Sequence, residues 1–271
     1  MNTNFSFADV TFRTASEIID THCHYNMEPL YADWRTHWQK AQENGVVRSI
    51  IPGTDLETSR RAVEIAEQDP ALQALVGMHP GLIVETSPVL EEVVQEFERL
   101  LASEKVVGIG EIGLDYFHTT SEDERAQQRV WLAAQLELAT KYSAPIALHV
   151  RDKESPEERV AGNAYWDTMS ALEAAEFSGE FILHCVSGPV SYVTQLVAQG
   201  AYVSFAGNLT YPKAQAIRDY LKLVEPNKIL CETDAPFLPP QQFRGQVCEP
   251  WMIRHTAEFL GNLPQEGRTL Q

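Results

Sequence analysis

Two patterns of hydrophobic and polar positions alternate along this chain. Short runs rich in Val, Ile, Leu and Phe are typical of buried strands, and longer amphipathic segments between them are typical of helices. The sequence predicts eight strands, at 18–22, 46–51, 72–78, 106–110, 145–149, 181–184, 201–205 and 228–232. This alternation is the pattern of βαβ units built around a parallel sheet.

The predicted helices lie between these strands and after the last one. They cover 34–43, 57–68, 89–102, 121–142, 164–175, 190–199, 213–224 and 251–260. The longest begins with Ser121 followed by Glu124, which is the spacing of a capping box. Eight strands interleaved with helices close naturally into a single-domain (β/α)₈ barrel, although an open doubly wound sheet has the same local pattern.

Composition and charge narrow the class of protein. Hydrophobic residues make up 44% of the 271 residues, enough for a sizeable core. We expect a cytoplasmic protein, because no apolar run approaches the roughly 18 residues of a membrane span and residues 1–16 lack a secretory signal. The four cysteines are far apart and form no C-x-x-C pair, which argues against a disulfide framework or a zinc knot.

The net charge of −17 is unfavourable for a broad surface that binds nucleic acid. It does not exclude a nucleic-acid substrate, because a cluster of carboxylates and histidines becomes locally electropositive once divalent cations are bound. A polyanion would then be bound at a metal site rather than by a basic surface.

The first predicted strand contains three residues of types that bind metals. A strand has a side-chain period of two, so Asp20, His22 and His24 are expected on one face and Cys23 on the other, packed as a small apolar residue. This D-x-H-x-H pattern is a metal-site hypothesis, which other residues of the same types along the chain would strengthen.

Such residues recur where later strands are predicted to end. They are His79, Glu111, His149, His184 and Asp234. In barrel enzymes the catalytic groups collect at the C-terminal ends of the strands. The remaining histidines, His37, His118 and His255, fall on helices or loops without a ligand partner at useful spacing, and no role is assigned to them.

Imidazole and carboxylate groups together suit Zn²⁺, Mn²⁺ or related divalent ions such as Mg²⁺. Four histidines with two or three carboxylates are more than one tetrahedral ion requires, so we expect two ions. A carboxylate such as Glu111 can bridge two ions about 3.5 to 4 Å apart, and a water that they share becomes a nucleophile at neutral pH. The predicted reaction is therefore hydrolysis.

Six ordered motifs between about Ile18 and Pro250 resemble those of the TatD-type metal-dependent deoxyribonucleases. This family is a branch of the amidohydrolase superfamily, whose members are (β/α)₈ barrels. The motifs are I-D-T-H-C-H from Ile19, G-M-H-P from Gly77, G-E-I-G-L-D-Y from Gly110, H-V-R from His149, H-C-V-S-G from His184 and E-T-D-A-P-F-L from Glu232. The resemblance favours the barrel over the open sheet.

The resemblance also implies roles for individual residues. Six of them would hold two metal ions: His22, His24 and Asp234 the first, His149 and His184 the second, with Glu111 between the two. Asp234 would also be the general base that takes the proton of the attacking water, so that it and Glu111 form the catalytic pair.

Three further residues, His79, Asp115 and Arg151, would line the substrate site of such an enzyme. Arg151 could pair with a phosphate oxygen, or it could form a structural ion pair. Asp20 would lie beside the metal ions, either as a shared ligand or as a support for the ligands.

The chain departs from the family pattern at three places. Cys248 stands where the family usually has asparagine in R-G-x-x-N-E-P, and Val186 stands where it usually has phenylalanine. The chain also ends at Gln271 without the family's final helix, which a truncated or a diverged terminus would explain.

We divide the chain into an N-terminal extension, 1–16, and a barrel domain, 17–271.

The resulting hypothesis is a two-metal hydrolase of DNA phosphodiester bonds. The same site could instead cleave a carboxylic ester or amide, such as the aminoacyl ester of a tRNA, because an activated water attacks a carbonyl equally well. A barrel that binds metal but has lost activity is the third reading. It is disfavoured because every ligand position keeps a residue that can bind metal.

Overall fold

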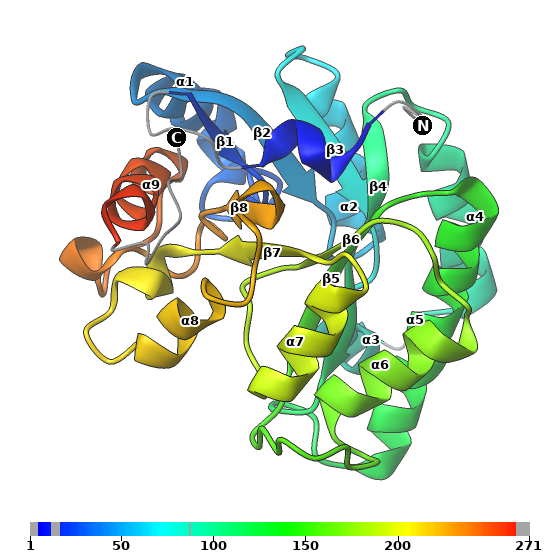
Figure 1. The fold of residues 1–271 in the computed structure, drawn as a ribbon. Helices are drawn as coiled ribbons and strands as arrows, with labels where there is room; N and C mark the ends of the chain where they lie inside the picture. Colours follow the sequence, from blue (N-terminus) through cyan, green and yellow to red (C-terminus); the bar gives the residue numbers. More distant parts are fainter. Residues whose placement is uncertain (1–4, 12–16, 87, 264–271) are drawn as a thin grey trace.

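Eight parallel strands form a nearly closed barrel in the computed structural model, which describes residues 5–11, 17–86 and 88–263 (Figure 1). The strands are β1 (Ile18–Asp20), β2 (Val46–Pro52), β3 (Leu72–Val76), β4 (Val106–Asp115), β5 (Ile146–Arg151), β6 (Phe181–Leu183), β7 (Tyr202–Phe205) and β8 (Ile229–Cys231). Each strand pairs with the next one in the sequence. Just after β1, the Thr21 amide donates to the Cys231 carbonyl at the end of β8, at 3.1 Å. The (β/α)₈ prediction is thus confirmed.

Nine α-helices are described, and they surround the sheet on its outer side (Figure 1). They are α1 (Trp34–Glu43), α2 (Leu56–Ala66), α3 (Pro80–Thr86), α4 (Leu90–Leu100), α5 (Glu122–Tyr142), α6 (Ala164–Ala174), α7 (Val190–Ala198), α8 (Gln215–Tyr220) and α9 (Ile253–Asn262). The capping box of α5 is confirmed, because the Ser121 hydroxyl accepts from the Glu124 amide at 3.3 Å. The helix α3 is not predicted by the sequence pattern, and α8 is shorter than the predicted 213–224.

Side chains alternate between two cores, as they must in a barrel. On β3, Leu75 belongs to the cluster inside the barrel, whereas Ala74 and Val76 belong to the core between strands and helices. Cys23 is buried in the outer core, as predicted. The interior cluster also includes Ile50, Val107, Ala147, Ile182 and Leu230.

The described part of the N-terminal extension packs against the barrel where the strands begin. The 3₁₀-helix η1 (Phe7–Val10), dark blue in Figure 1, buries Phe7 and Val10 in the interior cluster. The Glu180 carboxylate, which immediately precedes β6, accepts from the Phe7 amide at 3.0 Å and from the Ser6 hydroxyl at 2.9 Å. Residues 5–11 therefore share the core of the barrel, while 12–16 lie outside the described residues.

Candidate metal centre

The two histidines of the first motif lie just beyond β1, which ends at Asp20 rather than at His22 as predicted. The segment stays close to its neighbours because the Cys23 amide donates to Ile50 O at 3.1 Å and the His24 amide to Ala235 O at 2.8 Å. Both imidazoles are buried and their Nε2 atoms lie 3.2 Å apart. His22 and His24 therefore converge as expected, although the strand ends before it reaches them.

Glu111 lies between two sets of histidines. Its Oε2 is 3.4 Å from Nε2 of His22 and 3.6 Å from Nε2 of His24. Its Oε1 is 2.8 Å from Nδ1 of His149 and 3.4 Å from Nε2 of His184. One buried carboxylate thus presents a different oxygen to each set.

Glu111 lies within β4, which continues to Asp115 instead of ending at Gly110 as predicted. The pairing of β4 with β5 changes register between Ile109 and Ile112. The two strands approach very closely at Gly113, where φ is +144° and an added Cβ would lie 1.8 Å from the His149 carbonyl oxygen. Only glycine permits this approach, which keeps His149 opposite β4 and near Glu111.

Asp234 follows β8 and faces the same cluster. Its Oδ1 lies 3.5 Å from Nε2 of His24, 3.7 Å from Nε2 of His22 and 4.0 Å from Nε2 of His184. The Asp234 backbone has φ of +56°, and its amide donates to the His22 carbonyl at 2.9 Å. A left-handed aspartate is uncommon, and such conformations cluster at functional sites.

Two further carboxylates support the histidines from the side away from Glu111. Glu232 places Oε2 3.2 Å from Nδ1 of His184, while its Oε1 accepts from the Cys185 amide at 2.7 Å. Glu232 begins the motif E-T-D-A-P-F-L, but the sequence predicts no role for it. Its position two residues before Asp234, on the same strand end, was the available signal.

Asp115 is buried and supports His149. Its Oδ2 lies 3.3 Å from Nε2 of His149 and 2.8 Å from Nδ1 of His118. His118, for which the sequence predicts no role, is therefore linked to the cluster through Asp115. The three-residue spacing between Asp115 and His118 was the only sequence signal for this contact.

The Asp20 carboxylate bonds to the backbone that carries His22 and to Thr233, next to Asp234. It accepts from the Thr233 hydroxyl at 2.7 Å, the Thr233 amide at 3.0 Å and the His22 amide at 3.3 Å. Burial raises the pKa of Asp20 to about 8, although these hydrogen bonds oppose the shift. The geometry is that of a support for the His22 backbone.

Three groups of ligand atoms in the described part of the chain are close enough together to hold a metal ion. They are His22, His24 and Asp234; His22, His184 and Glu232; and His79, Glu111 and His149. Imidazole nitrogens and carboxylate oxygens are the donors that Zn²⁺, Mn²⁺ and related ions use. The donor set therefore fits divalent metal ions.

The protonation of the metal-free cluster supports this fit. Burial lowers the pKa of His149 and of His184, but Asp115 and Glu111 raise the first to about 9, and Glu232 and Glu111 raise the second to about 10. Burial alone would raise the pKa of Glu111, but the surrounding histidines hold it well below its usual range. Protons thus supply the positive charge that bound cations would supply.

His79 differs from the other histidines in its hydrogen bonding. Its Nδ1 accepts from the Gly81 amide at 3.0 Å, and its Nε2 lies 3.8 Å from Oε1 of Glu111. Burial, followed by the charge of His149, lowers the pKa of His79 to about 3. A neutral imidazole that accepts at Nδ1 carries its proton on Nε2, so His79 presents a hydrogen-bond donor to the site.

Arg151 lies at the exposed edge of the site. Its guanidinium carbon is 4.1 Å from the centroid of the Phe117 ring, which is a cation–π contact. Within the part of the chain that the structure describes, Arg151 forms no ion pair with a carboxylate, so the alternative of a structural ion pair gains no support.

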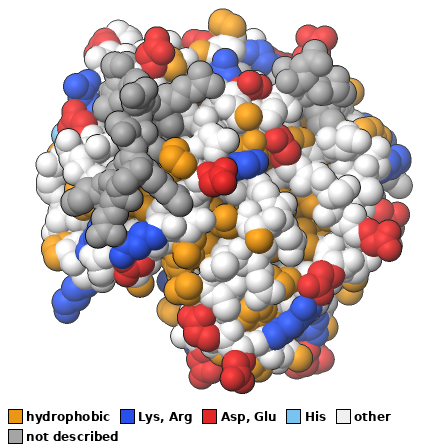
Figure 2. All heavy atoms as spheres, in the orientation of Figure 1, with side chains coloured by type: hydrophobic (Ala, Val, Ile, Leu, Met, Phe, Trp, Pro, Cys, Tyr) orange, Lys and Arg blue, Asp and Glu red, His pale blue; other side chains and the backbone are white. Residues whose placement is uncertain are grey.

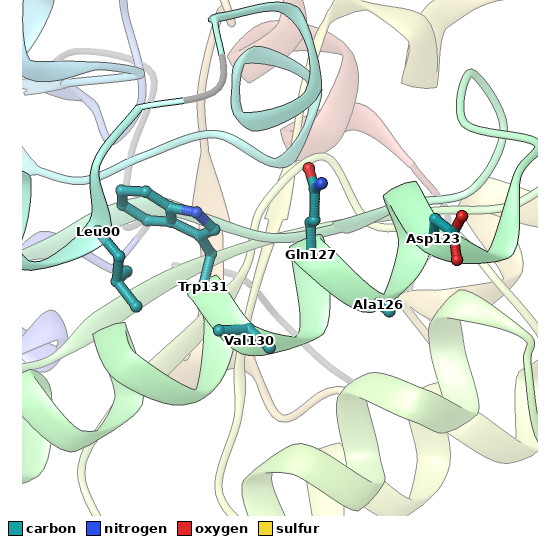
Figure 3. A pocket seen from close by; sticks show the side chains of 6 residues that line it. All are labelled: Leu90, Asp123, Ala126, Gln127, Val130 and Trp131. Carbon is teal, nitrogen blue, oxygen red and sulfur yellow. The ribbon is translucent and has the colours of Figure 1, made fainter.

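Outside this cluster, the described residues form no further group of His, Cys, Asp and Glu atoms close enough to hold a metal ion. Figure 2 shows Lys and Arg side chains separated by Asp and Glu on the face that it draws, rather than one broad basic patch. A hollow of about 300 Å³ lies between Leu90 and the α5 side chains from Asp123 to Trp131 (Figure 3). It contains none of the candidate metal ligands.

The helices of the described residues include none with the length and apolar composition of a membrane span.

Comparison with known proteins gives consistent matches. The family model described as TatD related DNase matches residues 19–268. The metal-dependent hydrolase YjjV of Escherichia coli (strain K12), described as uncharacterized, is 35% identical over 92% of this chain and 90% of the relative. YabD of Bacillus subtilis (strain 168), described in the same way, is 33% identical over 92% and 91% of the two chains.

A crystal structure of the Escherichia coli YjjV protein is also similar to this fold. The TM-score is 0.79 at 30% sequence identity, and the match covers 93% of this chain and 92% of the other. Sequence and fold therefore agree on the similarity to YjjV over nearly the whole length of both chains.

Proposed function

Because this chain belongs to the TatD family of metal-dependent hydrolases, we propose that it hydrolyses phosphodiester bonds of DNA with two divalent metal ions as cofactors. The observation that carries the proposal is the position of Glu111, whose two oxygens face separate sets of histidine nitrogens. Such a carboxylate suits a pair of ions. Divalent ions supply Lewis acidity at a phosphoryl oxygen and lower the pKa of water.

The ligands would divide as the two oxygens of Glu111 do. His22, His24 and Asp234 would hold one ion, and His149 and His184 the other. Glu232 and Asp115 would orient His184 and His149 through their second ring nitrogens, as carboxylates commonly do for ligating histidines.

Asp234 is suited to receive the proton of the attacking water. Its side chain is 14% exposed against 5% for Glu111, so it is the more accessible of the two carboxylates. Burial acts to raise its pKa, but the neighbouring His24, His184 and His22 lower it, so Asp234 is ionised at neutral pH. An ionised carboxylate at the open side of the cluster can act as a general base.

Two residues would contact the phosphate. The Nε2 proton of His79 points into the cluster and can donate to a phosphoryl oxygen. Arg151, held over Phe117, supplies a positive charge at the edge of the site. These local donors are consistent with binding of a polyanion by a chain of net charge −17.

The test is hydrolysis of a single-stranded oligodeoxynucleotide by the purified protein with Mg²⁺, Mn²⁺ or Zn²⁺, with an aminoacyl ester as the competing substrate. We expect metal-dependent release of nucleotides that Asp234→Asn reduces by about 100-fold or more, the scale of losing a catalytic acid or base. Asp219→Asn, on the exposed side of α8, is the matched control and should behave as wild type.

Cleavage of the ester but not of the oligonucleotide would replace the proposed substrate with a carboxylic ester. Oligonucleotide cleavage that persists in Asp234→Asn would identify a contaminating nuclease. Absence of both activities with every metal would leave the metal-binding scaffold as the better reading.

A further inference from the structure

Two exposed aromatic rings follow site residues at the C-terminal ends of strands. Phe117 comes two residues after Asp115 and is 38% exposed, and Phe237 comes three residues after Asp234 and is 49% exposed. The other exposed large hydrophobic residues among those described are valines. Among the described residues, the exposed phenyl groups are therefore confined to segments that border the metal centre.

The two rings differ in what already contacts them. The Arg151 guanidinium lies over the Phe117 ring, at 4.1 Å from its centroid. The Phe237 ring lies 6.2 Å from the His24 ring, centroid to centroid, at an interplanar angle of 77°. Because these two rings meet nearly at right angles, the contact with His24 is an edge contact and not a parallel stack.

The backbone around Phe237 is held firmly. Its amide donates to the Asp234 carbonyl at 2.8 Å, and the Cys248 amide donates to the Pro236 carbonyl at 3.0 Å. The Tyr211 hydroxyl donates to the Pro239 carbonyl at 2.9 Å. An exposed phenyl group on such a segment is presented to the solvent at a fixed distance from the metal ligands His24 and Asp234.

We propose that Phe237 is the platform on which the nucleotide base next to the scissile phosphate stacks. This inference rests on the proposed function and specifies the substrate further. A base has flat apolar faces, and stacking on an aromatic side chain strengthens binding without regard to sequence. Bases inside a duplex are already stacked on each other, so the platform selects DNA whose bases are unstacked at the cleavage point.

The experiment compares the metal-loaded wild type with Phe237→Leu and Phe237→Trp on two single-stranded oligodeoxynucleotides. One is unmodified, and the other lacks the bases on both sides of a single cleavable bond. Phe237→Leu keeps apolar bulk but removes the ring, whereas Phe237→Trp keeps a ring. Val247→Ala, at another exposed apolar residue, is the matched control.

On the unmodified strand we expect Phe237→Leu to raise KM by about tenfold, within the range of measured base stacking, and Phe237→Trp to restore it. On the abasic strand the wild type and Phe237→Leu should have equal KM values. An equal rise in KM on both strands, or no rise on the unmodified strand, would contradict the stacking role of Phe237.

A binding measurement keeps this result separate from the proposed function. A 2-aminopurine base next to a phosphorothioate bond, which resists hydrolysis, should lose fluorescence when it binds the wild type, and should lose much less with Phe237→Leu. Equal quenching by the wild type and Phe237→Leu would show that the base does not stack on Phe237, whether or not DNA is cleaved. Failure of the wild type to cleave any oligonucleotide would overturn the proposed function instead.

Discussion

The Nδ1 atom of His149 lies 2.8 Å from Oε1 of Glu111 across the junction of β4 and β5. The other oxygen of the same carboxylate faces His22 and His24. Glu111 therefore presents one carboxylate oxygen to each half of the candidate metal centre.

The substitution Glu111→Gln tests whether this carboxylate is needed to hold two metal ions. An amide keeps the shape of the side chain but loses the negative charge that two cations would share, so we expect fewer than two bound ions per chain and a loss of activity of about 100-fold or more. Metal content by mass spectrometry and kcat check this. Glu258→Gln, on the surface of α9, is the control, and full metal content in Glu111→Gln would contradict the bridging role.

The substitution Glu232→Gln tests the support of His184. Glu232 accepts at Oε2 from His184 Nδ1, and replacing such a partner of a ligating histidine typically lowers metal affinity by about 10- to 100-fold. We expect this loss in a competition titration with a metal-binding dye, with the far-ultraviolet circular dichroism unchanged. An unchanged affinity would mean that the contact is only structural.

The pH dependence of the metal-free protein follows from the raised histidine pKa values. The pKa values of His149 and His184, about 9 and about 10, exceed the ordinary 6.5, so their ion pairs with Asp115, Glu111 and Glu232 stabilise the fold fully below pH 6.5. This stability is lost as the pH rises through 9 to 10. Burial raises the pKa of Asp20 from 3.8 to about 8, so stability also falls as the pH rises toward 8, and this loss is complete once Asp20 ionises in the folded chain.

We therefore expect the Tm of the metal-free protein to fall between pH 6.5 and 10, and the affinity for metal to rise over the same interval because binding displaces the histidine protons. Differential scanning calorimetry after chelation and metal titrations at each pH are the measurements. A Tm that rises over this interval would show that these histidines are not charged in the metal-free state.

The substitution Phe7→Ala tests whether η1 is part of the barrel core. Phe7 is fully buried in the interior cluster, and truncation of a buried phenylalanine costs about 3–5 kcal/mol. Urea unfolding should show that loss, while KM stays unchanged because η1 lies at the end of the barrel opposite the metal centre. Wild-type stability would mean that residues 5–11 are an appendage. Exposed Val130→Ala is the control.

The sequence alone determined the repeating order of strands and helices and the types of residue at the strand ends. Both follow from local information, because burial sets the period of apolar positions and a strand end is marked by the residues next to it. The structure brings together all six expected ligands, from His22 to Asp234. Their assignment to individual ions remains a proposal.

Only the tertiary structure decided the relations that depend on contacts between distant segments. Closure of the barrel requires Thr21 to meet Cys231, and the packing of Phe7 requires η1 to reach Glu180. His149 faces Glu111 with Nδ1 because its other ring nitrogen, Nε2, contacts Asp115. A periodic pattern reports how deeply a residue is buried, but it does not report which atom of a side chain faces which partner.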